Sequence, residues 1–334
     1  MIHIDEEKIF STISERNPRS VALDGPDGIM KKIQSCAEKL RDKYNIPVYI
    51  IGDTSWGSCD LNIHAAEMLG VDILFNIGHT ISMESFGNKV IMVDAFDDID
   101  FTKIAKKCAV ELRKKNFKII SLATISQYIR SMQNVKEIFE SHGYEVVIGR
   151  GKGHLNDGQV FGCEFYPVYD TKDHVDAYLF LGQSIFHSAS IAIVTQKPTF
   201  MLDPYFNEYS EIGDIARKLE KKAILSVYKA QDAETVGIII GLKEGQFAKI
   251  KALELKRLLE AAGKKIVLIA MTEITDERLL SFEGIDAFIQ VACPRIGTDN
   301  HFHKPVLSVP QAISLIRLLK GEQQEEFLQI KHWL

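Results

Sequence analysis

Three of the five cysteines stand at related positions along the chain and could act together as thiolate ligands. Cys59 and Cys163 lie at the same distance before the aspartate of two related segments, and Cys293 ends a third such segment. Three thiolates at one point can ligate zinc or an iron–sulfur cluster. A three-cysteine set leaves one iron of a four-iron cluster without a protein ligand, and a substrate could bind there. The alternative is three unrelated thiols in the core, because free cysteine is among the most buried residue types.

The other two cysteines are predicted to be core residues. Cys36 shares the apolar face of a predicted helix with Ile33, and Cys108 shares that of another with Leu112. The five cysteines are odd in number and far apart, so a secreted disulfide scaffold is excluded.

The cysteines are placed by an internal repeat of one α/β unit. Each copy has an aspartate at its third position, then an apolar β-rich run, a small residue and a polar one. The three segments are GVDILFNIGH at 70–79, HVDAYLFLGQ at 174–183 and GIDAFIQVAC at 284–293. Each is preceded by an apolar strand, an amphipathic helix and a second apolar strand, and is followed by another apolar strand.

This alternation predicts an α/β fold in which each unit is a small parallel sheet flanked by helices. The predicted domains are 1–100 with Cys59, 101–218 with Cys163 and a connecting helix, and 219–334 with Cys293 and a C-terminal helix. All three cysteines then follow the carboxyl ends of parallel strands, where open α/β sheets bind ligands.

Composition narrows the class of protein. The chain has 334 residues, 25% of them charged, and a formal net charge of −5 with both signs mixed along its length. There is no basic block of the kind that binds nucleic acid. The start of the chain lacks the apolar core of a secretory signal, and the uncharged stretch at 177–196 is better explained as strand, turn and helix than as a membrane span. These features predict a soluble, cytoplasmic protein with reduced thiols.

Polar residues at the same predicted sheet edge are candidates for binding a small molecule. Asp53 precedes the Cys59 loop and could bind hydroxyl or ammonium groups, or could cap a helix or a turn. Gln183 and Ser184 occupy the place that Cys293 has in the third copy, which favours a site role over a capping serine beside a solvated glutamine.

The third copy supplies further candidates. Gln246 lies in a loop-to-helix turn after Gly245, where a helix N-terminus favours a carboxylate, with a plain tight turn as the alternative. Arg295 and Asp299 follow Cys293; the arginine could clamp a carboxylate, or the two could form a surface ion pair.

Several histidines and one glycine-rich stretch suggest other chemistry. His187 could face the site or lie within its helix, and His301 with His303 could bind a metal, although their loop favours solvent exposure. The stretch GRGKGH at 149–154 fails the dinucleotide pattern because residue 154 is histidine and no helix is predicted after it.

At these positions the chain resembles the archaeal diphthamide-biosynthesis enzyme family over essentially its whole length. The motifs that carry the resemblance are GDTSWGSCD at 52–60, VFGCEFYPV at 160–168, GLKEGQ at 241–246 and VACPRIGTD at 291–299. The wide spacing of the cysteines, one in each repeat, is specific to that family.

The resemblance implies three Rossmann-like domains in a pseudo-threefold arrangement and a [4Fe–4S] cluster ligated by Cys59, Cys163 and Cys293. It implies that S-adenosylmethionine binds at the open iron and gives a 3-amino-3-carboxypropyl radical, which adds to a histidine of translation elongation factor 2 in the first step of diphthamide biosynthesis. The implied partners are that factor, a second copy of the chain in a homodimer and an unidentified electron donor, with neither membrane nor nucleic acid.

Two other classes of function stay open on the residues alone. One is a zinc- or iron-dependent hydrolase that uses the same cysteines with His301 or His303. The other is a non-catalytic scaffold in which the repeat serves only architecture.

Overall fold

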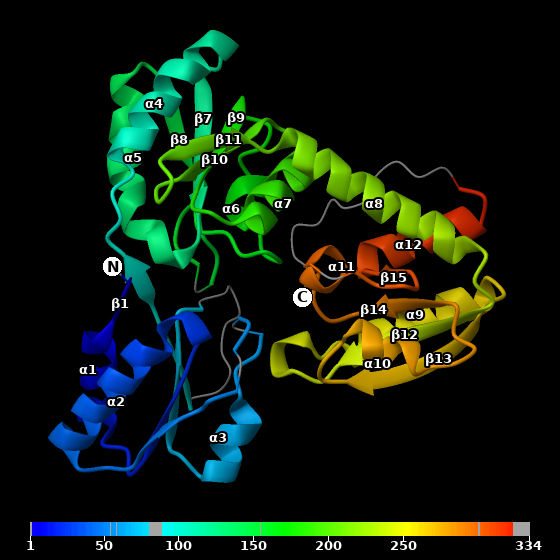
Figure 1. Cartoon of the computed structure of the whole chain (residues 1–334), viewed down its shortest axis with the longest axis horizontal. Coiled ribbons are helices and arrows are strands. Elements are labelled where there is room, and N and C mark those ends of the chain that lie inside the picture. Colours follow the sequence, from blue (N-terminus) through cyan, green and yellow to red (C-terminus); the bar gives the residue numbers. More distant parts are fainter. Residues whose placement is uncertain are drawn as a thin grey trace. The chain divides into compact units, whose positions relative to one another are not determined.

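The computed structural model describes residues 2–53, 55–57, 59–79, 89–153, 155–299 and 301–322. Within these ranges the chain forms three sheets of four or five strands and one two-stranded sheet (Figure 1). Each of the three larger sheets comes from one copy of the sequence repeat. Their first four strands have the same spatial order, in which the second strand is at the edge and the first lies beside the third.

The first sheet is parallel and has the order β3-β2-β4-β5. Its strands are β2 (Val21–Asp24), β3 (Val48–Ile50), β4 (Ile73–Ile77) and β5 (Val90–Val93). Helices α1 (Glu6–Arg16) and α2 (Met30–Tyr44), with the short turn η1 (Asp27–Ile29), cover one face, and α3 (Ile63–Leu69) covers the other (Figure 1). Strands β1 (Ile2–Ile4) and β6 (Ala95–Asp97) pair antiparallel beside it.

The second sheet has the order β11-β10-β9-β7-β8. Its strands are β7 (Ile119–Thr124), β8 (Glu145–Ile148), β9 (Ala177–Leu181), β10 (Thr199–Asp203) and β11 (Glu208–Glu211). Helices α4 (Thr102–Leu112) and α5 (Met132–Ser141) pack together over one core. The short helical segments are η2 (Arg113–Lys115), η3 (Ser126–Ser131) and α6 (Tyr166–Tyr169).

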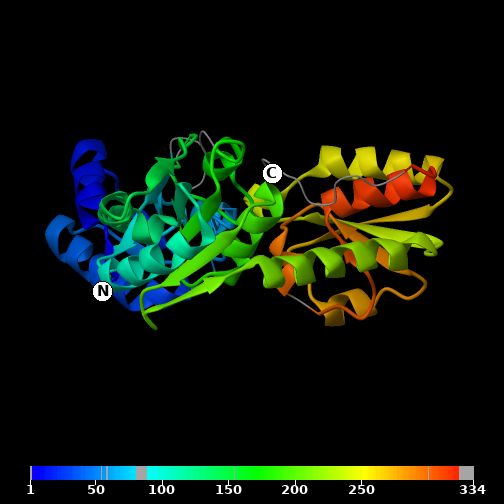
Figure 2. The same ribbon diagram turned by 90° about the horizontal axis from the view of Figure 1, so that it is seen from above.

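The third sheet is parallel with the order β13-β12-β14-β15. Its strands are β12 (Thr235–Gly241), β13 (Lys265–Met271), β14 (Ala287–Gln290) and β15 (Val306–Leu307). On one face α12 (Val309–Leu319) lies between α8 (Gly213–Gln231) and α9 (Lys249–Ala261), as Figure 2 shows, and α10 (Asp276–Leu280) packs on the other. The remaining helical segments are α7 (Ile185–Thr195), which packs on α8, η4 (Glu244–Gln246) and α11 (Arg295–Asp299).

Contacts divide the chain into two compact units. The first consists of Met1–Phe161, Tyr166–Gln183 and Phe200–Ser210, and the second of Gly162–Phe165, Ser184–Thr199 and Glu211–Leu334. The turn with Cys163 (Gly162–Phe165, here called the Cys163 turn) and α7 therefore pack with the third sheet, although they belong to the second repeat in sequence. The division into three domains stays a prediction, while the mixed α/β class with helix-flanked parallel sheets is confirmed.

The aspartate shared by the three repeats has a structural role. In each copy it stands just before the third strand and accepts backbone N–H groups at the start of the first strand. The bonds run from Arg19 to Asp72 (2.7 Å), from Lys118 and Ile119 to Asp176 (2.7 and 2.9 Å), and from Glu234 and Thr235 to Asp286 (3.0 and 2.9 Å). These backbone donors hold the pKa of Asp72 and Asp286 below the ordinary value. The repeat therefore pins the amino ends of the strands, opposite the edge that carries the cysteines.

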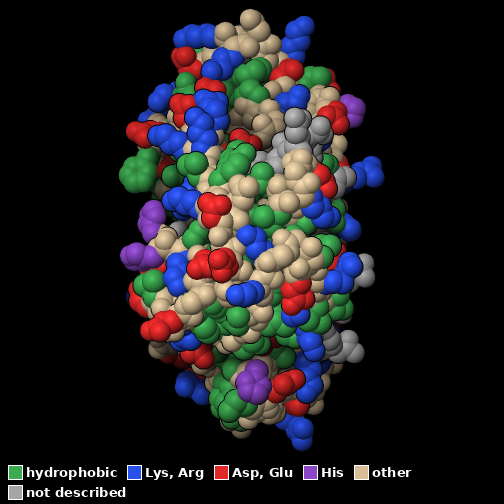
Figure 3. All heavy atoms as spheres, turned by 90° about the vertical axis from the view of Figure 1, so that its right-hand side faces the viewer, with side chains coloured by type: hydrophobic (Ala, Val, Ile, Leu, Met, Phe, Trp, Pro, Cys, Tyr) green, Lys and Arg blue, Asp and Glu red, His purple; other side chains and the backbone are tan. Residues whose placement is uncertain are grey.

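The prediction of strand, turn and helix for the uncharged stretch is confirmed. The uncharged stretch at 177–196 contains β9, a turn and α7. No helix among the described residues combines the length and the apolar character that crossing a membrane requires. On the face drawn in Figure 3, Lys and Arg side chains are interspersed with Asp and Glu rather than gathered by sign.

Candidate functional site

The five cysteines separate into two environments, and each carries a thiol rather than a disulfide. Cys36 in α2 and Cys108 in α4 are fully buried, and burial raises the pKa of their thiols to about 11 and about 12. Such thiols stay protonated and unreactive, as the core-facing prediction requires. Cys59, Cys163 and Cys293 are partly exposed, each in a loop that follows a strand. Only this second group is accessible for metal ligation.

Cys59 lies in the loop between β3 and α3, and three hydrogen bonds link described residues on either side of it. The Ser55 hydroxyl donates to the carbonyl of Asp60 (3.2 Å), and the Asp60 backbone N–H donates to the carbonyl of Gly57 (2.9 Å). The side-chain carboxylate of Asp60 accepts the backbone N–H of Trp56 (3.4 Å). These bonds close the loop around Cys59.

A buried polar group anchors the far end of that loop to the first sheet. Asp24, at the end of β2, is fully buried and accepts the amides of Asn62 (3.1 Å) and Asn76 (3.0 Å). Asn62 precedes α3, and Asn76 lies in β4. Burial raises the pKa of Asp24 to about 6, against the lowering effect of the two amides, and the charge of Asp60 raises it further. Sequence analysis missed this residue, although an aspartate closing an apolar strand was its available signal.

Asp24 gives the protein a specific pH dependence. Its ordinary pKa of 3.8 applies to the unfolded chain, so between about pH 6 and pH 4 the folded protein takes up a proton that the unfolded chain does not. As pH falls from 7 to 4, this group should therefore raise the free energy of unfolding by up to about 3 kcal/mol. Urea unfolding of the wild type and of Asp24→Asn across this range should show that the wild type gains stability relative to the variant. Parallel pH profiles would contradict it.

The Cys163 turn is shaped by the ring of Phe186. A Cβ added at Gly162 would lie only 1.7 Å from Cε1 of Phe186, so only glycine permits this ring to pack beside Cys163. Upstream, the loop is held to the end of β7, because Thr124 donates its N–H to Gly158 (3.0 Å) and accepts that of Val160 (2.7 Å).

Cys293 lies at the point of the third sheet where the strand order reverses, beyond the carboxyl ends of β12 and β14. The side chain of Gln290 bonds to the backbone of Cys293 and Ala292. Gln246 is buried next to this turn: a Cβ at Gly241 would lie 2.8 Å from Cβ of Ala292 and 3.2 Å from that of Gln246. The structure thus brings Gln246, a predicted site residue, close to the Cys293 turn.

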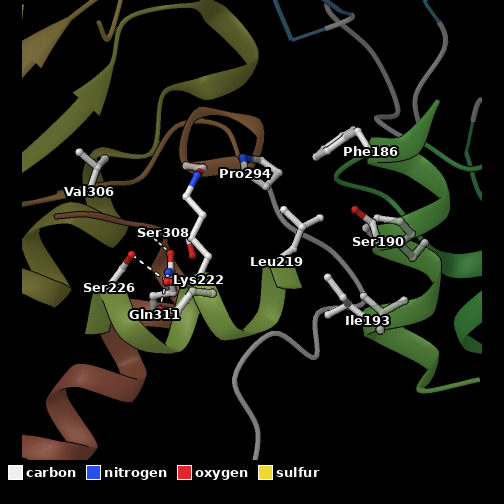
Figure 4. Close-up of a pocket in the computed structure, with 15 residues that line it drawn as sticks. Phe186, Ser190, Ile193, Leu219, Lys222, Ser226, Pro294, Val306, Ser308 and Gln311 are labelled. Atoms are coloured by element: carbon white, nitrogen blue, oxygen red, sulfur yellow. Dashed lines mark hydrogen bonds between the residues drawn. The ribbon is translucent and has the colours of Figure 1, made fainter. Parts of the chain in front are cut away.

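A pocket lies between the Cys163 and Cys293 turns in the second unit. It has a cavity volume of about 90 Å³, and Gly162 and Pro294 are among the residues that line it. Figure 4 shows Phe186 and Ser190 extending from α7 and Lys222 reaching from α8 toward the turn with Pro294. The Lys222 ammonium donates to the carbonyl of Gly297 (3.4 Å). A largely apolar wall with a few polar groups is typical of small-molecule sites.

Arg295 and His187 both lie beside the ring of Phe186, which lines this pocket. The Arg295 guanidinium carbon is 5.0 Å from the centre of the Phe186 ring, and its side chain is exposed. Burial lowers the pKa of His187 to about 3, and the charge of Arg295 lowers it further, so this imidazole is neutral. Its Nδ1 is 2.6 Å from the hydroxyl of Ser184. A positively charged group thus stands beside a residue that lines the pocket, and the role of Arg295 as a carboxylate clamp stays a prediction.

The other residues predicted to bind a small molecule lie in varied surroundings. Ser184 caps α7 by accepting the N–H of His187, which was the alternative to a site role, and Gln183 donates to the carboxylate of Asp203 rather than being merely solvated. Asp53 is exposed after β3. The side chain of Asp299 lies outside the described residues. A site role for these residues stays a prediction.

The alternative metal pair has the predicted exposure. His301 and His303 are both exposed, and Nδ1 of His303 pairs with the carboxylate of Asp276. Within the described ranges, no three side chains of His, Cys, Asp or Glu gather closely enough to hold a metal ion. Cys59 belongs to the first unit, and Cys163 and Cys293 to the second, so the meeting of the three cysteines stays a prediction.

His79 is another residue that sequence analysis passed over. It follows β4 at the place that Cys293 has after β14, and its ring lies edge-on to Phe161, with centroids 6.5 Å apart. Burial lowers the pKa of His79 to about 4. The shared repeat position of His79, Gln183 and Cys293 was the available signal.

Comparison with known proteins identifies the family. The model for diphthamide synthesis proteins matches residues 25–327. The 2-(3-amino-3-carboxypropyl)histidine synthase of Pyrococcus horikoshii is 30% identical over 98% of this chain and 95% of its own length. Subunit 1 of the enzyme of the same name from Kluyveromyces lactis is 28% identical over 90% of this chain and 72% of its own length.

A solved structure agrees with these relatives. The crystal structure of Dph2 from Pyrococcus horikoshii with a 4Fe-4S cluster superposes with a TM-score of 0.87 at 30% identity, covering 98% of this chain and 94% of that one. The predicted resemblance is confirmed in sequence and in fold. The chain therefore belongs to the diphthamide synthesis family, and the two relatives just described are named as 2-(3-amino-3-carboxypropyl)histidine synthases.

Proposed function

We propose that this protein transfers the 3-amino-3-carboxypropyl group of S-adenosylmethionine to a histidine of translation elongation factor 2, the first step of diphthamide biosynthesis. The observation that carries the proposal is the division of the cysteines. The three that match the family motifs are the three that are partly exposed in loops after strands, and the two others are buried with raised thiol pKa values. The solved relative with a 4Fe-4S cluster supports the same assignment.

The residues present fit an iron–sulfur cluster. Cys59, Cys163 and Cys293 would be the ligands, one from each repeat, and they would leave one iron open for S-adenosylmethionine. The identical strand order of the three sheets supports three related domains, at 1–100, 101–218 and 219–334, in a pseudo-threefold arrangement that brings the loops together. A homodimer and a separate electron donor complete the proposed enzyme.

The chemistry that such a cluster supplies when bound is one-electron reduction of the sulfonium, which breaks the bond from sulfur to the γ-carbon and yields methylthioadenosine and a 3-amino-3-carboxypropyl radical. Overall the transfer is redox-neutral: the sulfonium and the imidazole C–H give methylthioadenosine, the substituted imidazole and one proton. The protein would supply orientation and exclude competing reactions.

The pocket residues are suited to that task. Phe186 and Ile193 offer apolar surface in the pocket, and the Arg295 guanidinium, 5.0 Å from the centre of the Phe186 ring, would bind the methionine carboxylate. Gln246 is buried next to the Cys293 turn and is a further proposed contact. The other proposed contacts are Asp53, Gln183, Ser184 and Asp299.

Transfer of labelled groups tests this function. The protein, reduced anaerobically with dithionite, is incubated with elongation factor 2 and S-adenosylmethionine labelled in the methionine carboxylate. We expect the label in the factor. The matched control carries the label in the S-methyl group, which should stay with the nucleoside product. Methyl label in the factor, or no carboxylate label there, would overturn the proposal.

A further inference from the structure

The Cys293 turn is held by one buried side chain. Gln290, the last residue of β14, is fully buried. Its amide oxygen accepts the backbone N–H groups of Ala292 (2.8 Å) and Cys293 (3.0 Å), and its amide nitrogen donates to the carbonyl of Cys293 (2.9 Å). A single amide therefore bonds to both peptide groups that flank the Cys293 Cα, and the Cys293 carbonyl also accepts the N–H of Ile296 (3.1 Å).

The chemistry of this contact requires an amide. The amide of Gln or Asn presents an acceptor and a donor side by side at every pH, as the N–H and C=O groups of one turn require. A carboxylate could accept the two N–H bonds but could not donate to the carbonyl when ionised. An apolar side chain would remove all three hydrogen bonds, including the acceptor that the Ala292 and Cys293 N–H groups share, and a lost acceptor of buried N–H groups is costly.

The first repeat uses the same strand position in a related way. Asn76 aligns with Gln290 within the repeated segment and is also fully buried. Its amide donates to Asp24, which in turn accepts the amide of Asn62, just beyond the Cys59 loop. In both copies a buried amide on the third strand secures a cysteine loop, directly for Cys293 and through Asp24 for Cys59.

We propose that Gln290 is a positioning residue, which fixes the backbone of Cys293 so that its thiolate is held in the orientation that cluster binding requires. This inference rests on the proposed function, because it takes Cys293 as a cluster ligand. Residues that orient a ligand without touching the metal commonly change metal affinity by about 10–100-fold when they are replaced. Gln290 acts at the backbone of its ligand rather than at the sulfur.

The test compares Gln290→Met and Gln290→Glu with the wild type in the full-length protein. After anaerobic reconstitution, we expect both variants to lose iron to a ferrous chelator faster, Gln290→Met by about tenfold or more and Gln290→Glu by less, since it keeps the acceptor. The electron paramagnetic resonance spectrum of the reduced Gln290→Met protein should also shift from that of the wild type.

Asp286→Ala is the matched control. Asp286 stands just before β14 and bonds to the backbone at the start of β12, at the opposite end of these strands from Gln290. The substitution should lower thermal stability but leave the chelator rate and the spectrum unchanged, which separates positioning from general destabilisation. If Gln290→Met matched the wild type in both readouts while Cys293→Ala lost its iron, the inference alone would fail. If the wild type took up no cluster, or Cys293→Ala kept one, the proposed function would fail together with it.

Discussion

We expect each single alanine variant of Cys59, Cys163 and Cys293 to bind almost no iron after anaerobic reconstitution, whereas the wild type binds about four irons per chain. With only two of the three cysteines left, two of the four irons lack a protein ligand. An exposed cluster held in this way is readily lost. The broad visible absorption and the transfer of the aminocarboxypropyl group should disappear with the iron. Iron analysis and absorption spectra of the three variants check this.

The two buried cysteines provide the control within the same chain. Cys36→Ala and Cys108→Ala remove thiols that burial keeps protonated, so both variants should keep the iron and the turnover of the wild type. Their cost should be confined to stability, at about 1–2 kcal/mol for a small core truncation. If Cys293→Ala kept the iron and the turnover of the wild type, the proposal that Cys59, Cys163 and Cys293 ligate one cluster would be wrong.

Gly162→Ala should have the second large effect, although it adds a single methyl group. The new Cβ would lie 1.7 Å from Cε1 of Phe186, so the ring must leave its place between the Cys163 turn and the pocket. Overpacking of this kind costs about 1–3 kcal/mol in stability. Because a shift of about an ångström can cost about 100-fold in rate, we expect kcat/KM for S-adenosylmethionine to fall by that order.

A second substitution separates the clash from other effects. In Gly162→Ala with Phe186→Leu, the smaller side chain should relieve the overlap, so the double variant should be more stable than Gly162→Ala alone. Gly28→Ala is the matched control, because a Cβ there would meet nothing within 4 Å. Kinetics and thermal unfolding of the four proteins would refute the account if Gly162→Ala behaved like Gly28→Ala.

The sequence was sufficient to predict the repeated architecture, because the spacing of apolar residues along the chain distinguishes its strands from its helices. The strands of each copy, their flanking helices and the loops with Cys59, Cys163 and Cys293 all follow from apolar runs of matching length. The buried state of Cys36 and Cys108 follows from helical spacing in the same way.

The polar contacts of the site depend on tertiary structure and were harder to predict. Ser184 caps α7, as capping serines do, although its repeat position favoured a site role. Gln290 and Asn76 were each a single amide inside an apolar strand, which signals a buried polar group but not its partner. Those partners, the Cys293 turn and Asp24, are set by the packing of neighbouring strands.

The nucleoside product tests the central claim most directly. The reduced protein is mixed anaerobically with S-adenosylmethionine and elongation factor 2, and the adenosine-containing product is identified by mass spectrometry. Methylthioadenosine, formed in step with modification of the factor, is the predicted result. 5′-Deoxyadenosine without modification of the factor would contradict the proposed cleavage and with it the function assigned to the three cysteines.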